Sequence, residues 1–307
     1  MKTQKILFLA FLMIFPTAAV KAAPAVTLPA MPVAIPCDGI APPSTEMLQK
    51  TLDEANALIL VNANDPMAYV KRGAALGDQG EHKKAIEDYN RAILLDPNNA
   101  DAFFNRGFDF EALGNLEAAF ADYGKAITLD PGFADPYLGL GRVLSERGMW
   151  QEAVASYNKV VELDPNYAEA YYNRALAFDA LGQTAPAALD YQKAITLNPN
   201  DACAYNNLAL DQQSMGDTNA AMTSYNRAIS IDPQLATAYA NRAGLYAQLG
   251  NMSGAQADLG EAIRLEPKEA RFHFDRADVQ RQQKKYGPYL RDLWDGYQKK
   301  WAASKKS

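Results

Sequence analysis

The sequence is poor in the residues that build metal and catalytic sites. It has 307 residues but only two histidines and two cysteines, which excludes a His-rich metal cluster. Its longest apolar run is Ile6 to Phe15. Ten residues are too few for a membrane span, which needs about 20. We therefore expect no metal, no cofactor and no integral membrane span.

The motifs of nucleotide-binding and hydrolytic enzymes are missing as well. There is no phosphate-binding loop and no Gly-x-Ser-x-Gly sequence. Gly139 and Gly141 superficially resemble part of a nucleotide loop, but they lie in a stretch expected to be helical and lack a third glycine. The acidic residues are scattered over expected helix ends and solvent positions. An enzyme is the least favoured interpretation.

Positive charge of the kind that binds nucleic acid is also lacking. The formal net charge is −6. Residues 1–22 contain Lys2, Lys5 and Lys21 and no acid, so removing them changes the charge from −6 to −9. Lys and Arg form no stripe that recurs along the chain. Because a nucleic-acid binder needs a basic face, we expect no nucleic-acid partner.

What the sequence does contain is an internal repeat of 34 residues, seen in three sets of positions. A glycine set, a tyrosine set and a proline set each recur at that interval. The members are Gly80, Gly114, Gly148, Gly182, Gly216 and Gly250; Tyr89, Tyr123, Tyr157, Tyr191 and Tyr225; and Pro97, Pro131, Pro165, Pro199, Pro233 and Pro267. Lys284 stands where a seventh glycine would fall. A fixed period of this length indicates stacked supersecondary units.

The conformational preferences of glycine and proline explain why these residues recur. Glycine adopts the left-handed conformation that closes a helix. Proline stops the next helix and disfavours helical geometry in the residue before it. Between these stops, apolar residues spaced by three and four predict two amphipathic helices of roughly 13 residues. In the unit Pro165–Pro199 we expect one helix from Ala168 to about Leu181 and another from about Ala185.

This pattern closely resembles the tetratricopeptide repeat, strongly from Pro66 to Pro267 and more weakly to Trp301. The resemblance implies an all-α fold, a right-handed α-solenoid of stacked antiparallel helix pairs. It also implies a non-catalytic scaffold that binds a protein or peptide. Five repeats carry Arg at the seventh position, where the family more often has Leu, and we assign no function to that variant.

In this family the first helix of each repeat lines a concave groove. One groove position carries Asn in four repeats, which resembles the asparagine ladder of members that hold extended peptides. Asn is also frequent there in repeats with no known ligand, so a role without a ligand is the alternative. With neighbouring aromatic anchors and acidic residues, the expected groove residues are Asp101, Phe104, Asn105, Phe108, Asp135, Glu169, Tyr172, Asn173, Asn207, Asn241 and Phe274.

The ends of the chain suggest export and capping. A basic start, an apolar run and small residues before Pro24 are typical of a signal peptide, with cleavage favoured near Ala22 and an alternative near Ala19. The protein is therefore expected to be periplasmic or secreted. The last helix either caps the solenoid or docks a partner. The expected segments are a signal peptide (1–22), a proline-rich extended segment (23–43), a capping helix (44–62), the solenoid (66–284) and a C-terminal capping helix with a basic tail (285–307).

The two cysteines, Cys37 and Cys203, are far apart in this arrangement. Export permits a disulfide, but the expected separation of roughly 40 Å along the stacked helices favours two free thiols or an intermolecular bridge.

The leading functional hypothesis is an adaptor that binds an extended peptide segment in its groove outside the cytoplasm. The alternative is an architectural subunit of a cell-envelope or secretion assembly, acting through its convex face and C-terminal helix. The oligomeric state stays open.

Overall fold

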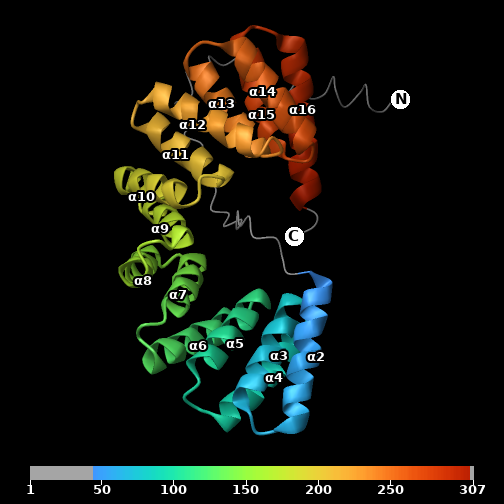
Figure 1. Ribbon diagram of the computed structural model, residues 1–307. Helices are drawn as coiled ribbons and strands as arrows, with labels where there is room; N and C mark the ends of the chain where they lie inside the picture. Colours follow the sequence, from blue (N-terminus) through green and yellow to red (C-terminus); the bar gives the residue numbers. More distant parts are fainter. Residues whose placement is uncertain (1–43, 305–307) are drawn as a thin grey trace, which may run out of the picture. The chain divides into compact units, whose positions relative to one another are not determined.

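A computed structural model describes residues 44–304 of the protein. The expected signal peptide (1–22) and proline-rich segment (23–43) lie outside the described residues. The described part of the chain is built from α-helices, without a strand, and each helix packs against the next along the chain (Figure 1). The expected all-α solenoid of repeats is thus confirmed.

Each repeat contributes a first and a second helix. The first helices are α3 (Pro66–Asp78), α5 (Ala100–Ala112), α7 (Ala134–Glu146), α9 (Ala168–Ala180), α11 (Ala202–Ser214), α13 (Ala236–Gln248) and α15 (Ala270–Gln282). The second helices are α4 (His82–Leu95), α6 (Leu116–Leu129), α8 (Trp150–Leu163), α10 (Thr184–Leu197), α12 (Thr218–Ile231), α14 (Met252–Leu265) and α16 (Tyr286–Ser304). A further helix, α2 (Thr45–Val61), packs on α3 and begins after Ser44, whose side chain accepts a hydrogen bond from the Met47 N–H.

The turn glycines and the prolines act as the sequence predicts. The six glycines between first and second helices all have φ between 71° and 87°. The residue before each repeat proline lies outside the helical region of backbone geometry, as at Asp164 (φ −132°, ψ 98°) before Pro165. Its backbone N–H still donates to Val160, so the helix ends without an orphaned amide.

The core lies between paired helices, where small residues meet buried tyrosines. Tyr89, Tyr123 and Tyr157 are at most 1% exposed. A Cβ atom added to Gly73 would lie 2.7 Å from Tyr89 Cε1, and one added to Gly139 would lie 2.5 Å from Tyr123 Cζ. These glycines therefore let aromatic rings pack against a helix backbone, and the glycines of α7 have a packing role.

The repeated arginines form partly buried ion pairs. In five repeats the guanidinium makes a two-bonded contact with an Asp sixteen residues later, on the second helix: Arg72–Asp88, Arg106–Asp122, Arg174–Asp190, Arg242–Asp258 and Arg276–Asp292. In four of them the arginine also donates to an Asn on the preceding helix: Asn56, Asn90, Asn158 and Asn226. The arginine thus connects three helices.

The C-terminal helix α16 packs on α15. Gly296 is buried against Phe274, whose ring meets that of Tyr297 at a centroid distance of 5.3 Å in an edge-on arrangement. Leu290, Trp294, Tyr297 and Trp301 remain 37–59% exposed. Among residues 44–304 no helix combines the length and apolar character needed to span a bilayer.

Lys284 occupies the turn position that is glycine in the six preceding repeats, and it adopts the same left-handed geometry with φ 58°. A residue with a Cβ pays about 1 kcal/mol for that conformation. Lys284→Gly should therefore raise the free energy of unfolding by about 1 kcal/mol, measured by urea denaturation. Gly250→Lys is the matched reverse change and should lower it by a similar amount. A neutral or destabilising Lys284→Gly would contradict this assignment.

Candidate functional site

The candidate site is the first-helix face, which we define as the side of α5, α7, α9, α11, α13 and α15 that carries the expected peptide-binding residues. These helices are neighbours: α5 contacts α7, α7 contacts α9, α11 contacts α13, and α13 contacts α15. Hydrogen bonds between side chains connect them further, including a bond between α9 and α11. The face is therefore continuous from the second repeat to the seventh.

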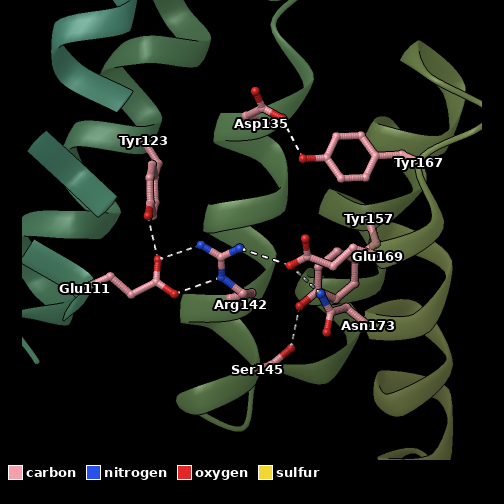
Figure 2. A network of polar contacts seen from close by, with 9 residues as sticks. All are labelled: Glu111, Tyr123, Asp135, Arg142, Ser145, Tyr157, Tyr167, Glu169 and Asn173. Carbon is pink, nitrogen blue, oxygen red and sulfur yellow. Dashed lines mark hydrogen bonds and ion pairs between the residues drawn. The ribbon is translucent and has the colours of Figure 1, made fainter. Parts of the chain in front are cut away.

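Arg142 of α7 organises the first half of this face (Figure 2). Its Nε and Nη2 donate to the Glu111 carboxylate at 2.9 and 3.2 Å, and its Nη1 donates to Glu169 Oε1 at 3.3 Å. Tyr123 donates its hydroxyl to Glu111 at 2.5 Å, and Asn173 Nδ2 lies 3.4 Å from Glu169 Oε1. One guanidinium thereby joins three successive first helices.

The electrostatics keep this arginine charged. Burial disfavours its positive charge, but the hydrogen bonds and attraction of Glu111, with further attraction from Glu169, outweigh that cost and raise the pKa of Arg142. The Asp135 carboxylate likewise accepts a hydrogen bond from the Tyr167 hydroxyl at 2.7 Å. Two of the three acidic residues expected to attract a basic ligand are thus already paired, and Asp101 is the exposed one.

A chain of side-chain hydrogen bonds runs along the second half of the face. Asn207 Nδ2 donates to the Tyr172 hydroxyl at 3.3 Å, and Asn206 Nδ2 donates to Asn207 Oδ1 at 3.1 Å. Asn241 Nδ2 donates to Asn206 Oδ1 at 2.9 Å, and Arg271 Nη2 donates to Asn241 Oδ1 at 3.3 Å. We call these five residues the amide chain; they extend from α9 to α15.

The four expected ladder asparagines differ in exposure. Asn173 and Asn241 are buried, at 8% and 6% exposed, whereas Asn105 and Asn207 are half-buried. Asn105 Nδ2 donates to the backbone oxygen of Asp101 within its own helix at 2.8 Å. Asn207 is therefore the ladder residue that is both accessible and connected to its neighbours.

The expected aromatic anchors also separate into exposed and covered groups. Phe108 is 48% exposed, with the Arg142 guanidinium carbon 5.9 Å from its ring centroid. Phe104 packs edge-on against Phe133 at 5.1 Å. Tyr172 is 8% exposed and packs edge-on against a second-helix tyrosine. Phe274 is covered in part by α16. Phe108 is thus the large apolar side chain on this face that a ligand can reach.

Two carboxyl groups meet between the fourth and fifth repeats. Asp179 of α9 and Asp211 of α11 share a hydrogen bond, and Asp179 also accepts from the Tyr191 hydroxyl at 2.7 Å. Burial, together with the neighbouring charge of Asp179, raises the pKa of Asp211 to about 8. Burial also raises the pKa of Asp179. The pair therefore retains a proton at neutral pH.

One group of described residues has the composition of a metal site. Ligand atoms of His273, Asp292 and Asp295 lie within 4.8 Å of one another. Both Asp292 oxygens accept hydrogen bonds from Arg276, and one also accepts from Gln280. Because that carboxylate is already neutralised by a guanidinium, the cluster is explained by the repeated arginine–aspartate pair.

The structure corrects the expectation for the cysteines. Cys203, half-buried near the start of α11, is disulfide-bonded. The preference for free thiols is thus wrong for this residue. Cys37 lies outside the described residues.

Sequence reasoning missed three residues of this face, namely Arg142, Asn206 and Arg271. Each stands at a position where the other repeats carry different residue types, so a search for recurring residues does not find them. Their signal is chemical: a long cation or a second amide beside a predicted ladder position.

Comparison with known proteins agrees with the repeat pattern. Family models described as TPR repeat match residues 73–112, 141–182 and 213–250, and models described as tetratricopeptide repeat match residues 100–133, 168–201 and 245–287. Together these matches cover more than half of the chain. No curated protein matches it.

Solved structures give the same result. The chain is similar to YrrB, described as a TPR protein with an unusual peptide-binding site, at 27% identity and a TM-score of 0.53 over 59% of this chain and 94% of YrrB. It is similar to MamA at 32% identity and a TM-score of 0.50 over 54% of this chain and 96% of MamA. Pseudomonas aeruginosa pilF, at 20% identity and a TM-score of 0.63 over 75% and 99% of the two chains, shares the fold.

The repeat spacing, the paired helices and these matches lead to one conclusion. The chain belongs to the tetratricopeptide-repeat family, whose stacked helix pairs serve as a scaffold for protein–protein interactions.

Proposed function

We propose that this protein is a non-catalytic adaptor, exported from the cytoplasm, that binds an extended peptide segment along the first-helix face. The observation that carries the proposal is the amide chain. Each asparagine side chain has two N–H groups and an oxygen that can accept two bonds. The bonds within the chain therefore leave capacity for the carbonyl and N–H groups of an extended backbone.

The composition of the face supports the same ligand class. Asn207 offers polar contacts that do not depend on peptide sequence, Phe108 offers an apolar contact, and Asp101 offers a negative charge. The likeness to YrrB, whose description names a peptide-binding site, adds support. An extended peptide with an apolar side chain and a basic residue fits these three features. Export is supported by the N-terminal signal-like sequence.

The double substitution Asn206→Ala with Asn207→Ala, which removes two neighbouring members of the amide chain, tests the proposal. A crosslinked pull-down from the native cell extract first identifies the bound segment, and a synthetic peptide of that segment then serves as the probe. We expect the double variant to lose binding at least tenfold, because each lost hydrogen bond contributes about 1 kcal/mol. The helical circular dichroism signal should be retained.

Asn219→Ala is the matched control, since Asn219 is exposed on the second helix α12. It should leave peptide binding unchanged. Equal peptide binding by the wild type and the folded double variant would refute binding along the first-helix face.

A second candidate function rests on the exposed apolar side chains of α16. Leu290, Trp294, Tyr297 and Trp301 are exposed on one terminal helix, which favours an architectural subunit that docks through this end. The same pull-down separates the two. Capture that survives the asparagine substitutions but is lost with Trp294→Ala and Trp301→Ala would favour the architectural function.

A further inference from the structure

The ladder position of the repeats changes its chemistry at the C-terminal end of the first-helix face. It carries Asn105, Asn173, Asn207 and Asn241, and 34 residues after Asn241 it carries Asp275, on α15. An asparagine amide both donates and accepts hydrogen bonds, whereas an ionised carboxylate only accepts them. The seventh repeat therefore offers a ligand a different group from the four asparagines before it.

Arg271 places this carboxylate next to the amide chain. Its Nη2 donates to Asn241 Oδ1 at 3.3 Å, and its Nε lies 3.7 Å from Asp275 Oδ2. One guanidinium thus lies between the last ladder asparagine and the aspartate. Asp275 continues the row of polar side chains that we propose bind a peptide backbone.

The negative charge of Asp275 is incompletely compensated within residues 44–304. Its separation from Arg271 is too long for a hydrogen bond, and no other described residue donates one to it. Burial, opposed by Arg271 and assisted by the negative charges of Asp278 and Glu269, raises the pKa of Asp275 to about 6. The carboxyl is therefore ionised above that pH, and with its side chain 23% exposed it is accessible to a ligand.

A purely structural role explains this aspartate less well. Packing at this position does not need a carboxylate, because four other repeats carry asparagine there. Groups whose pKa is shifted by burial and by neighbouring charges concentrate at functional sites, where a ligand supplies the missing partner.

We propose that Asp275 is a specificity-determining residue of the first-helix face and binds a protonated amine of the peptide whose backbone lies along the amide chain. This assignment rests on the proposed function. A protonated amine brings a positive charge and up to three N–H donors, and a carboxylate accepts such charge-assisted hydrogen bonds. The amine belongs either to a lysine side chain or to the amino terminus of the peptide.

The probe for the test is a peptide selected on the wild-type full chain from a displayed library of random sequences. It is synthesised with a dye at its carboxyl end in three forms: unmodified, with each lysine replaced by norleucine, and with an acetylated amino terminus. We expect one of the two modifications to weaken binding to the wild type by about tenfold, the effect of losing one charge-assisted hydrogen bond. Which of them does so identifies the source of the amine.

Asp275→Asn completes a double-mutant cycle with these probes. It gives the seventh repeat the residue that four other repeats carry, and helical circular dichroism checks that the variant is folded. We expect it to bind the unmodified peptide about tenfold more weakly than the wild type does, and the decisive peptide modification should then have no further effect. If Asp275 only orients Arg271, the substitution would weaken the unmodified and modified peptides equally.

Asp278→Asn is the matched control. Asp278 lies one turn later on α15 and pairs with Arg281 at 3.2 Å, so its removal takes away the same charge without the proposed contact. This variant should bind all three probes as the wild type does.

Equal binding of the unmodified probe by the wild type and the folded Asp275→Asn chain would overturn the inference, and so would an equal loss for all three probes. In either case the Asn206→Ala, Asn207→Ala double variant would still lose binding if the proposed function holds. Failure of the proposed function has another signature, namely probe binding that the asparagine double variant retains. A wild-type chain that selects no peptide would overturn both.

Discussion

Replacing Asp190 with serine should lower the free energy of unfolding by about 3 kcal/mol, and adding Arg174→Leu to that variant should recover most of the loss. Arg174 Nε and Nη2 donate to the two Asp190 oxygens at 2.6 and 2.7 Å, and the side chains are only 15% and 10% exposed. Removing one partner leaves an uncompensated buried charge, which costs about 3 kcal/mol or more.

The chain itself contains the control for this experiment. The third and fifth repeats lack the arginine and carry Leu at its position, and in both the partner aspartate is replaced by serine: Leu140 with Ser156 and Leu208 with Ser224. The double variant therefore gives the fourth repeat a pair that already exists in a neighbouring repeat. Its free energy of unfolding should lie within about 1 kcal/mol of the wild type.

A double-mutant cycle by urea denaturation at neutral pH measures the coupling. Glu261→Ser, which breaks the exposed Glu261–Arg264 pair, is the surface control and should change little. If the costs of Arg174→Leu and Asp190→Ser simply add in the double variant, the two side chains do not act as a unit and the expectation fails.

The same pair shows how far the sequence predicts this fold. Glycine and proline control the backbone through local sterics, so their spacing is sufficient to predict the turn at Gly182 and the end of a helix before Pro165. The Arg–Asp pair was also detectable, because the two positions change together within one chain. That signal lies in a comparison between repeats and was missed when arginine was considered alone.

The candidate site was less predictable for a physical reason. The repeat pattern predicts the helix face on which a residue lies, but the hydrogen bonds of that residue depend on side chains from several repeats. Glu169 was expected to attract a basic ligand, yet Arg142 reaches it from the neighbouring helix. Asn173 was expected in an open ladder but is buried beside the same carboxylate. Long polar side chains on adjacent first helices pair with each other, and position alone does not encode that choice.

The buried carboxyl pair should make the stability of the wild type fall as the pH rises from 5 to 9. Burial raises the pKa of Asp211 to about 8, from an ordinary value of 3.8. A carboxyl with a higher pKa in the folded chain holds its proton more tightly there than in the unfolded chain. Its stabilising contribution is therefore complete below about pH 4 and is lost as the pH rises towards 8.

Asp211→Asn should remove most of this dependence. An asparagine amide can donate to Asp179 as the protonated carboxyl does, but it carries no charge at any pH in this range. Because one pKa unit corresponds to about 1.4 kcal/mol, we expect the variant to exceed the wild type by roughly 3 kcal/mol at pH 9 and to match it near pH 5. Urea denaturation at intervals between these values gives both curves.

The difference between the wild-type and Asp211→Asn stability curves isolates the contribution of the Asp179–Asp211 pair to the pH dependence. Burial raises the pKa of Asp109, which His82 contacts, so this group can also add to the pH dependence. It is present in both proteins, and its contribution cancels. Tyr191 and Tyr225, whose pKa values burial and the nearby carboxylates raise, stay protonated up to pH 9. Asp101→Asn, at an exposed carboxyl on the same face, should keep the wild-type slope. A wild-type stability that stays flat from pH 5 to 9, or an unchanged slope in Asp211→Asn, would show that the two carboxyls ionise without cost.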